Sequence, residues 1–302
     1  RMKKDTFLGV FKSKGRLNKE ANSKYRSPFQ RDRDRIIHSA SFRRLKHKTQ
    51  VFVNTEGDHY RTRITHSMEV AQIARSIARY LNLNEDLAET LSLAHDLGHT
   101  PFGHAGEDSL NECMEKYDGF DHNLQTLRIV MFLENKYLKF NGLNLSIETL
   151  EGLLKHNGPV DDLDLVDNLI GIKKFKNMIK FETYPSLEAQ ISAISDDIAY
   201  NNHDIQDGIK AKKIFIEQLE DLPIFYDQMS EVLAKYPRLS KSKIVSETVR
   251  KIINMLVNDV IKNSNEEIKK ENISTSEDVR NCKKTLICFS DEIKRLNIEL
   301  KK

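Results

Sequence analysis

The chain has 302 residues, of which 39% are hydrophobic and 31% charged, with a formal net charge of +3. This composition is typical of a globular protein, and at about 150 residues per domain the length allows two domains or one large one. No apolar run approaches the roughly 20 residues that span a bilayer, and residues 1–5 contain no signal-peptide core. The cysteines Cys113, Cys282 and Cys288 form no CxxC pair, which excludes a secreted disulfide scaffold. We therefore expect a cytoplasmic protein with no membrane partner.

Helical periodicity dominates the chain, because apolar residues recur at i, i+3, i+4 and i+7 in several segments. N-cap residues and Gly or Pro stops mark the ends of some of these segments. In chain order, the expected helices span residues 66–81, 85–97 after the N-cap Asn84, 147–156 after the N-cap Ser146, 186–200 and 246–262.

The segments between the expected helices are polar or only weakly strand-like. Residues 263–276 are polar and charged, which predicts an exposed connection. Residues 49–53 and 285–289 are the only stretches with β character, and the sequence contains no internal repeat, GxGxxG motif or P-loop. The sequence therefore predicts a mainly α protein without a firm domain boundary.

Basic residues concentrate in one part of the chain. Between Lys24 and Arg63 there are eleven Lys and Arg residues against four acidic residues. Such a cluster can bind the phosphates of a nucleotide or of single-stranded nucleic acid. The alternative is a solvated face held by salt bridges, which the alternation Arg-Asp-Arg-Asp-Arg at residues 31–35 favours.

Histidines and one aspartate form the most distinctive pattern. Five of the ten histidines lie between positions 66 and 122, most densely from His95 to His104. The adjacent His95 and Asp96 at a helix end can both reach one ion beyond that end, with His99 close by. Imidazole and carboxylate ligands suit a divalent ion such as Mn, Fe, Zn or Mg. The alternative is a set of ordinary core or surface histidines beside a solvated acid.

A second polar group follows about a hundred residues later. Asp196, Tyr200 and Asp204 are spaced at i, i+4 and i+8, so a continuous helix would place them on one face. If that face is buried, the three side chains need a metal, a ligand or each other as partners. From periodicity alone, a solvent-facing helix surface is an equally good interpretation.

The order of these motifs resembles the H…HD…D signature of the HD phosphohydrolase superfamily. The segments RITHS at 63–67, HDLGHTPFGHAGE at 95–107 and DDIAYNNHD at 196–204 resemble its deoxyguanosine triphosphate triphosphohydrolase (dGTPase-like) branch. The resemblance covers about residues 25–208 and implies an all-α fold, an HD-domain helical bundle with additional C-terminal helices. It divides the chain into a basic segment of the nucleotide pocket (1–60), the HD core (61–210) and a C-terminal helical region (211–302). Members of this branch usually continue with further C-terminal helices.

The resemblance also implies a reaction, in which a dNTP is hydrolysed at the α-phosphorus to a deoxynucleoside and inorganic triphosphate. The implied cofactor is one divalent metal per active site, drawn from Mn, Mg, Fe, Zn and Co. The implied partners are the dNTP substrate, a dNTP effector and further copies of the chain in a homo-oligomer. Two other interpretations fit the residues: an HD phosphohydrolase acting on nucleoside monophosphates or a signalling nucleotide, and a nucleotide or single-stranded nucleic-acid binding protein with weak catalysis.

Carried over to the matching positions, the resemblance assigns a role to each site residue. The metal ligands would be His66, His95, Asp96 and Asp196. The acid/base pair beside the scissile bond would be His104 with Glu107, and the assisting groups on the phosphate side would be His99 and His122.

The substrate contacts follow from the same resemblance. Arg63 would contact the triphosphate, and Gln50 would reach the sugar 3′-hydroxyl. Tyr200 and Asp204 would hold the sugar, with the Tyr200 ring packed where a ribose 2′-hydroxyl would sit. Lys155 is a weaker candidate for a phosphate contact, because lysines at helix ends also interact with the helix dipole.

Overall fold

The structure is a computed structural model that describes residues 8–50, 60–175, 177–219 and 221–300. Over these residues the chain forms fourteen α-helices and no β-strand, which confirms the predicted all-α class. None of the described helices combines the length and the apolar character needed to cross a membrane. The helices are α1 (Pro28–Ile37), α2 (Ala40–Arg44), α3 (Arg63–Tyr80), α4 (Glu85–Ala94), α5 (Gly103–Cys113), α6 (His122–Arg128), α7 (Ile147–Leu154), α8 (Leu163–Leu169), α9 (Leu187–Lys210), α10 (Ile216–Leu219), α11 (Pro223–Lys235), α12 (Lys241–Lys270), α13 (Ser276–Asn281) and α14 (Asp291–Leu300). Four short 3₁₀ or π segments are η1 (Leu45–His47), η2 (Glu115–Tyr117), η3 (Ile129–Leu133) and η4 (Ile172–Phe175).

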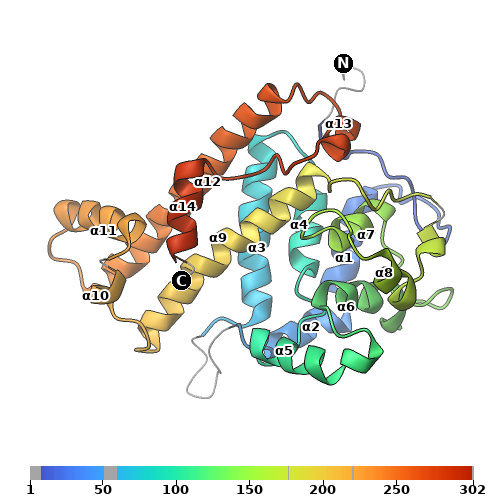
Figure 1. Cartoon of the computed structure of the whole chain (residues 1–302), viewed down its shortest axis with the longest axis horizontal. Helices are drawn as coiled ribbons and strands as arrows, with labels where there is room; N and C mark the ends of the chain where they lie inside the picture. Colours follow the sequence, from blue (N-terminus) through green and yellow to red (C-terminus); the bar gives the residue numbers. More distant parts are fainter. Residues whose placement is uncertain (1–7, 51–59, 176, 220, 301–302) are drawn as a thin grey trace.

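Helices α3, α4 and α9 form the centre of the bundle. α3 packs against both α4 and α9, while α1 and α7 pack on α4, and α12 packs on α9 and α11 (Figure 1). One apolar cluster joins α3, α9, α11 and α12 and includes Ile77, Ile198 and Ile252. A second joins α1, α4, α6 and α7 and includes Phe29 and Leu91. The central helices therefore have apolar cores on both sides, which fixes the positions of the polar side chains that they carry.

The predicted helix starts are confirmed at three N-caps. The side chains of Asn84, Ser146 and Ser186 each accept a hydrogen bond from the backbone N–H three residues later. Such a cap satisfies a backbone donor that has no partner inside the helix, so it is a signal carried by local sequence. The helix predicted over 186–200 is longer in the structure, since α9 continues to Lys210.

The exposed connection predicted at residues 263–276 is wrong for its first half, because α12 continues to Lys270. Val260, Ser264 and Ile268 are buried on one face of this continuation, which extends the contact of α12 with the core. The Lys and Glu residues of the segment are good helix formers, so their polarity marks the solvent side of a helix rather than a loop. The helix ends at Lys270, and Asn272, two residues later, has a left-handed φ of 54°.

The strand predicted at residues 285–289 is also wrong. The backbone N–H groups of Leu286 and Ile287 both donate to Oε1 of Gln190, and that of Cys288 donates to Oγ of Ser264. Side chains of α9 and α12 thus satisfy the donors that a neighbouring strand would otherwise satisfy, which holds the segment in an irregular conformation. Most of the other strand-like stretch, residues 49–53, lies outside the described residues.

Candidate active site

A tight turn at the end of α4 carries the His95–Asp96 pair. α4 ends at Ala94, and the backbone N–H groups of Leu97 and His99 donate to the carbonyls of Ala94 and Asp96. The Thr126 hydroxyl on α6 accepts a hydrogen bond from Gly98 N at 2.9 Å and lies 3.2 Å from the His95 carbonyl oxygen, to which it donates. This hydroxyl therefore fixes the turn against α6.

Gly98 permits that close approach to α6. A Cβ at position 98 would lie 2.2 Å from the His122 carbonyl oxygen and 2.3 Å from Thr126 N. Both are backbone atoms of a helix, so neither can move without moving α6. The glycine is therefore required by packing between the His95–Asp96 turn and α6.

Three elements position the four predicted metal ligands, and donor atoms of three of them, His66, His95 and Asp196, lie within 4.8 Å of one another. His66 comes from α3, His95 and Asp96 from the turn after α4, and Asp196 from α9. Nε2 of His66 lies 2.8 Å from Oδ1 of Asp196, although the two residues are 130 positions apart. Nε2 of His95 lies 3.5 Å from Oδ1 of Asp96 and 3.5 Å from Oδ1 of Asp196.

The separations among His66, His95 and Asp196 fit a single divalent cation, and Asp96 adjoins this group through His95. Donor atoms about 2.1 Å from a shared ion lie about 3.0 Å apart in octahedral and about 3.4 Å apart in tetrahedral geometry. Among the described residues, no group satisfies the buried Nε2 of His95 with a hydrogen bond of normal length, and an ion at this position would do so. Two imidazoles and two carboxylates form a donor set suited to Mn, Fe, Zn or Co and less specifically to Mg.

The charges of the cluster are strongly interdependent. Burial alone would lower the pKa of the His95 imidazole, but Asp96 and Asp196 outweigh it and raise that pKa to about 9. Burial would raise the pKa of both carboxyls, but His95 holds each below its ordinary range, with Arg63 adding to the effect on Asp96. Two carboxylates therefore stay ionised in a buried site, where their negative charge favours a cation.

A second group of ionisable side chains comes from the turn after α4, from α5 and from the start of α6. Donor atoms of His99, His104 and Glu107 all lie within 4.8 Å of one another. Oε1 of Glu107 is 2.7 Å from Nδ1 of His122 and also accepts the His122 backbone N–H at 3.1 Å. Glu107 thus makes its hydrogen bonds to His122, whereas the sequence pairs it with His104.

The rings of these histidines form a contact series toward α9. The His99 ring stacks on the His122 ring at a centroid distance of 5.0 Å and meets the His104 ring edge-on at 5.6 Å. The exposed His104 in turn lies 6.3 Å from the ring of Tyr200. Burial and the neighbouring Arg63 lower the pKa of His99 to about 4, so His99 is neutral near pH 7.

The predicted substrate contacts Arg63 and Gln50 are both buried and incompletely bonded. Arg63 donates to Oδ2 of Asp96 at 2.6 Å, while its Nε has no hydrogen-bond partner. Oε1 of Gln50 likewise has no partner among the described residues, which do not include the segment 51–59 that follows it. A Cβ at Gly103 would lie 3.7 Å from the Gln50 carbonyl oxygen and 3.8 Å from a terminal nitrogen of Arg63, so the two residues flank the start of α5.

Tyr200 and Asp204 lie on the same face of α9 as Asp196, and they hydrogen-bond each other. Burial, with a contribution from Asp207, raises the pKa of Asp204 to about 7. Burial and Asp204 also raise the pKa of Tyr200. The pair therefore presents a hydroxyl and a carboxyl that changes protonation near neutrality.

The surroundings of Lys155 do not fit the phosphate contact for which it was a weaker candidate. Its side chain is fully buried, and its ammonium donates to Oε1 of Glu151, the Lys180 carbonyl oxygen and Oγ1 of Thr183. An ammonium group has three N–H donors, so none is left for a ligand. Lys155 is instead a structural residue that joins the end of α7 to the segment before α9.

Two residues that the sequence did not single out border the site. Nζ of Lys48 donates to the His99 carbonyl oxygen at 2.7 Å, and burial followed by Arg63 lowers its pKa. His156, directly after Lys155, stacks on the His95 ring at 5.7 Å. Burial and the nearby His95 lower the pKa of His156 to about 4. No spacing rule connects either residue to the His95–Asp96 motif, so only the tertiary structure shows them.

The basic residues between Lys24 and Arg63 are largely paired with acids. The pairs are Arg26–Asp34, Arg31–Glu20, Arg33 with Asp86 and Glu89, Arg35–Glu20, Arg61 with Glu69 and Asp207, and Arg63–Asp96. This arrangement favours the salt-bridged face over a continuous surface for nucleic acid. Arg63 is the member of the set that reaches the His/Asp cluster.

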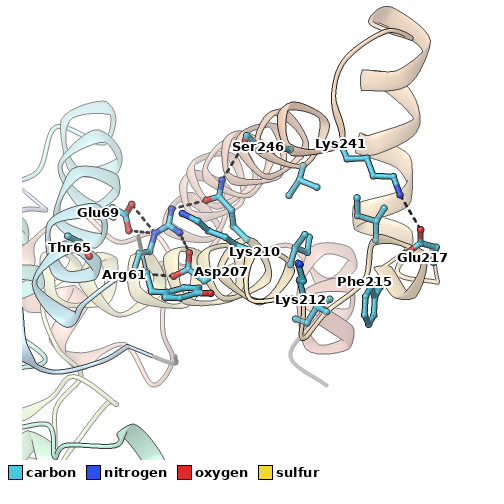
Figure 2. Close-up of a pocket in the computed structure, with 17 residues that line it drawn as sticks. Arg61, Thr65, Glu69, Asp207, Lys210, Lys212, Phe215, Glu217, Lys241 and Ser246 are labelled. Carbon is cyan, nitrogen blue, oxygen red and sulfur yellow. Dashed lines mark hydrogen bonds and ion pairs between the residues drawn. The ribbon is translucent and has the colours of Figure 1, made fainter. Parts of the chain in front are cut away.

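A cavity of about 820 Å³ lies between the start of α3, the end of α9, α10 and the start of α12 (Figure 2). Arg61 lies along one wall, where its guanidinium bonds Glu69, Asp207 and Gln206. Asp207 is one helical turn beyond Asp204, so this ionic network adjoins the part of α9 that carries the predicted sugar contacts. Arg61 thereby joins the amino-terminal end of α3 to the carboxyl-terminal half of α9.

The all-α bundle and the His/Asp cluster on α3, α4 and α9 define a hydrolase of the HD-domain class. The family model for the HD domain matches residues 63–201, the part of the chain that carries all four predicted metal ligands. A protein of Pelagibacter ubique (strain HTCC1062) is 63% identical over 97% of this chain and 79% of its own length. Proteins of Brucella ovis and Rickettsia felis are 51% and 48% identical over 93% and 96% of this chain and 72% and 76% of their own lengths. All three are named deoxyguanosinetriphosphate triphosphohydrolase-like protein. The chain belongs to this deoxyguanosinetriphosphate triphosphohydrolase-like family.

Proposed function

We propose that the protein is a metal-dependent dNTP triphosphohydrolase, which converts a dNTP and water to a deoxynucleoside and inorganic triphosphate. The observation that carries the proposal is the convergence of His66, His95 and Asp196 from three separate elements to within 4.8 Å of one another, with Asp96 3.5 Å from His95. In the reaction the bond between the α-phosphorus and the nucleoside 5′-oxygen breaks, and a bond between the water oxygen and that phosphorus forms. The names of the relatives support a nucleotide as the substrate.

The four converging residues would hold one divalent cation, with Mn, Mg, Fe, Zn and Co all compatible with the donor set. When bound, such an ion polarises a phosphoryl oxygen and lowers the pKa of a bound water. Arg63 holds Oδ2 of Asp96 and thereby directs its Oδ1 toward His95. That arrangement keeps the carboxylate in the orientation that the ion requires.

The second histidine group would supply the proton for the leaving 5′-oxygen. We assign this role to His104, which is exposed and lies beside Glu107 and Tyr200. Glu107 fixes the tautomer and orientation of His122 through the 2.7 Å contact to Nδ1. His99 and His122 would contact the phosphate oxygens, and the neutral His99 can do so as a hydrogen-bond donor.

The incompletely bonded polar groups would recognise the rest of the nucleotide. Oε1 of Gln50 is a buried acceptor without a donor among the described residues, which suits a sugar 3′-hydroxyl. The free Nε of Arg63 suits a phosphate oxygen of the triphosphate. Tyr200 and Asp204 would lie along the sugar, where the Tyr200 ring would exclude a 2′-hydroxyl.

Product analysis tests the proposal. The protein is incubated with each dNTP and Mn²⁺ or Mg²⁺, singly and in mixtures, and inorganic triphosphate is measured by ion chromatography. Release of triphosphate is expected, and in ¹⁸O-labelled water the label should enter the triphosphate and not the deoxynucleoside. Activity confined to mixtures would identify a dNTP effector.

The variant Asp96→Ala serves as the negative control, since it should lose both metal and turnover. Release of orthophosphate or pyrophosphate in place of triphosphate would contradict the proposal and favour an HD phosphohydrolase with a different substrate. Binding of single-stranded DNA that persists in Asp96→Ala, without turnover of any dNTP by the unmodified protein, would favour a nucleic-acid binding protein.

A further inference from the structure

The end of α7 holds His156 in a rigid position. Lys155 N donates to the Glu151 carbonyl oxygen at 2.9 Å, which closes the last turn of the helix. The buried Lys155 ammonium then bonds the Glu151 carboxylate, the Lys180 carbonyl oxygen and the Thr183 hydroxyl. The backbone that carries His156 is therefore anchored immediately before it.

The anchored His156 side chain faces the His/Asp cluster. Its ring lies 5.7 Å from the His95 ring at an interplanar angle of 23°, so the two imidazoles are stacked. Its Nε2 lies 4.0 Å from Oδ2 of Asp196, and its side chain is only 12% exposed. His156 thus contacts two of the four proposed metal ligands, and it comes from an element that supplies none of them.

The two oxygens of Asp196 have different surroundings. Oδ1 lies 2.8 Å from Nε2 of His66 and 3.5 Å from Nε2 of His95, so it faces the space proposed for the ion. Oδ2 faces His156. The 4.0 Å separation exceeds a normal hydrogen bond by about 1 Å, so the contact requires the imidazole and the carboxylate to move toward each other.

We propose that His156 is a positioning residue of the metal centre. Its Nε2–H donates to Oδ2 of Asp196 and so directs Oδ1 toward the ion, while its ring fixes the plane of His95. The inference rests on the proposed function, because it requires that the four predicted ligands hold an ion. Outer groups that orient ligands in this way commonly change metal affinity or activity about 10–100-fold when they are lost.

Two variants separate the two contacts of His156. His156→Phe retains an aromatic ring against His95 but removes the donor to Asp196. His156→Gln retains an amide donor at similar reach but removes the aromatic ring. His38→Gln, at an exposed histidine after α1 and outside the proposed site, is the matched control.

The measurements are Mn²⁺ titration of the metal-free full chain and the visible absorption of the Co²⁺-loaded protein. We expect His156→Phe to weaken Mn²⁺ binding about 10–100-fold and to shift the Co²⁺ bands. His156→Gln should remain closer to the unmodified protein than to His156→Phe, and His38→Gln should be unchanged. If His156→Phe does not fold by circular dichroism, His156→Leu, which also lacks the donor, replaces it.

Three results would overturn the inference. The first is unchanged Mn²⁺ affinity in His156→Phe or His156→Leu. The second is an equal loss in the Gln and Phe variants, since a retained hydrogen-bond donor at this position would then not preserve metal affinity. The third is that the unmodified chain binds two ions and every His156 variant binds only one. His156 would then be a ligand of the second ion. An error in the proposed ligand set is distinguished by another variant, because Asp96→Ala would then keep the Mn²⁺ affinity of the unmodified protein.

Discussion

Gly98→Ala should displace the His95–Asp96 turn from α6. The added Cβ would lie 2.2 Å from the His122 carbonyl oxygen and 2.3 Å from Thr126 N, where ordinary contacts are about 3.4 Å. The turn must therefore move outward by about 1 Å, which also strains the hydrogen bond from Gly98 N to the Thr126 hydroxyl. Overpacking of this kind costs about 3 kcal/mol when backbone atoms oppose it.

The expected consequences are a loss of stability and a larger loss of turnover. At roughly 2 °C per kcal/mol for a chain of this size, Tm should fall by about 6 °C in differential scanning calorimetry. A displacement of about 1 Å of His95 and Asp96 should lower kcat/KM for the best dNTP about 100-fold.

Gly208→Ala is the matched control for this substitution. The three atoms nearest to its Cβ would be side-chain atoms of Ile214, the closest at 2.6 Å, and a side chain can adjust its rotamer. We expect this variant to keep its activity. A Gly98→Ala protein with unchanged Tm and unchanged kcat/KM would refute the packing role assigned to Gly98.

Three further predictions concern single side chains. His104→Ala should slow turnover roughly 10²–10⁴-fold while Mn²⁺ and dNTP binding persist, and a large loss of Mn²⁺ affinity by calorimetry would show that His104 is a ligand. Lys155→Met should lower the free energy of unfolding by about 3–5 kcal/mol in urea, because it leaves the buried Glu151 with one cation, Arg280; a change under about 1 kcal/mol would contradict this. The pKa of Asp204 is raised to about 7, so the folded chain favours the protonated carboxyl. The contribution of this carboxyl to stability is therefore present at a pH below the ordinary aspartate range and is lost as the pH rises through 7. Urea midpoints between pH 4 and 8 should therefore fall less in Asp204→Asn than in the unmodified protein, and parallel curves would exclude the effect.

Features that depend on neighbours in sequence could be predicted from the sequence. Asn84, Ser146 and Ser186 cap their helices through bonds to residues three positions later, so the information is local. The convergence of His66 with Asp196 across 130 positions is not local. It was anticipated only through the order of the family motifs, and the packing of α3 on α9 supplies its physical basis.

Features that depend on tertiary contacts could not be predicted. The charge of Lys155 suggested a ligand contact, but three acceptors from α7 and the segment before α9 surround it. The spacing of His104 and Glu107 suggested a pair, but the start of α6 brings His122 closer to Glu107. His156 has no motif of its own, because its relation to Asp196 exists only after α7 and α9 have packed.

Helix α9 also limits how the site can change. Asp196, Tyr200 and Asp204 stand on one uninterrupted helix, so the rise of about 1.5 Å per residue sets intervals of about 6 Å between them. An insertion or deletion of one residue between Asp196 and Asp204 would rotate one end of the trio by about 100° relative to the other. Length changes are therefore excluded in this part of the chain, and altered sugar selectivity has to come from replacing side chains.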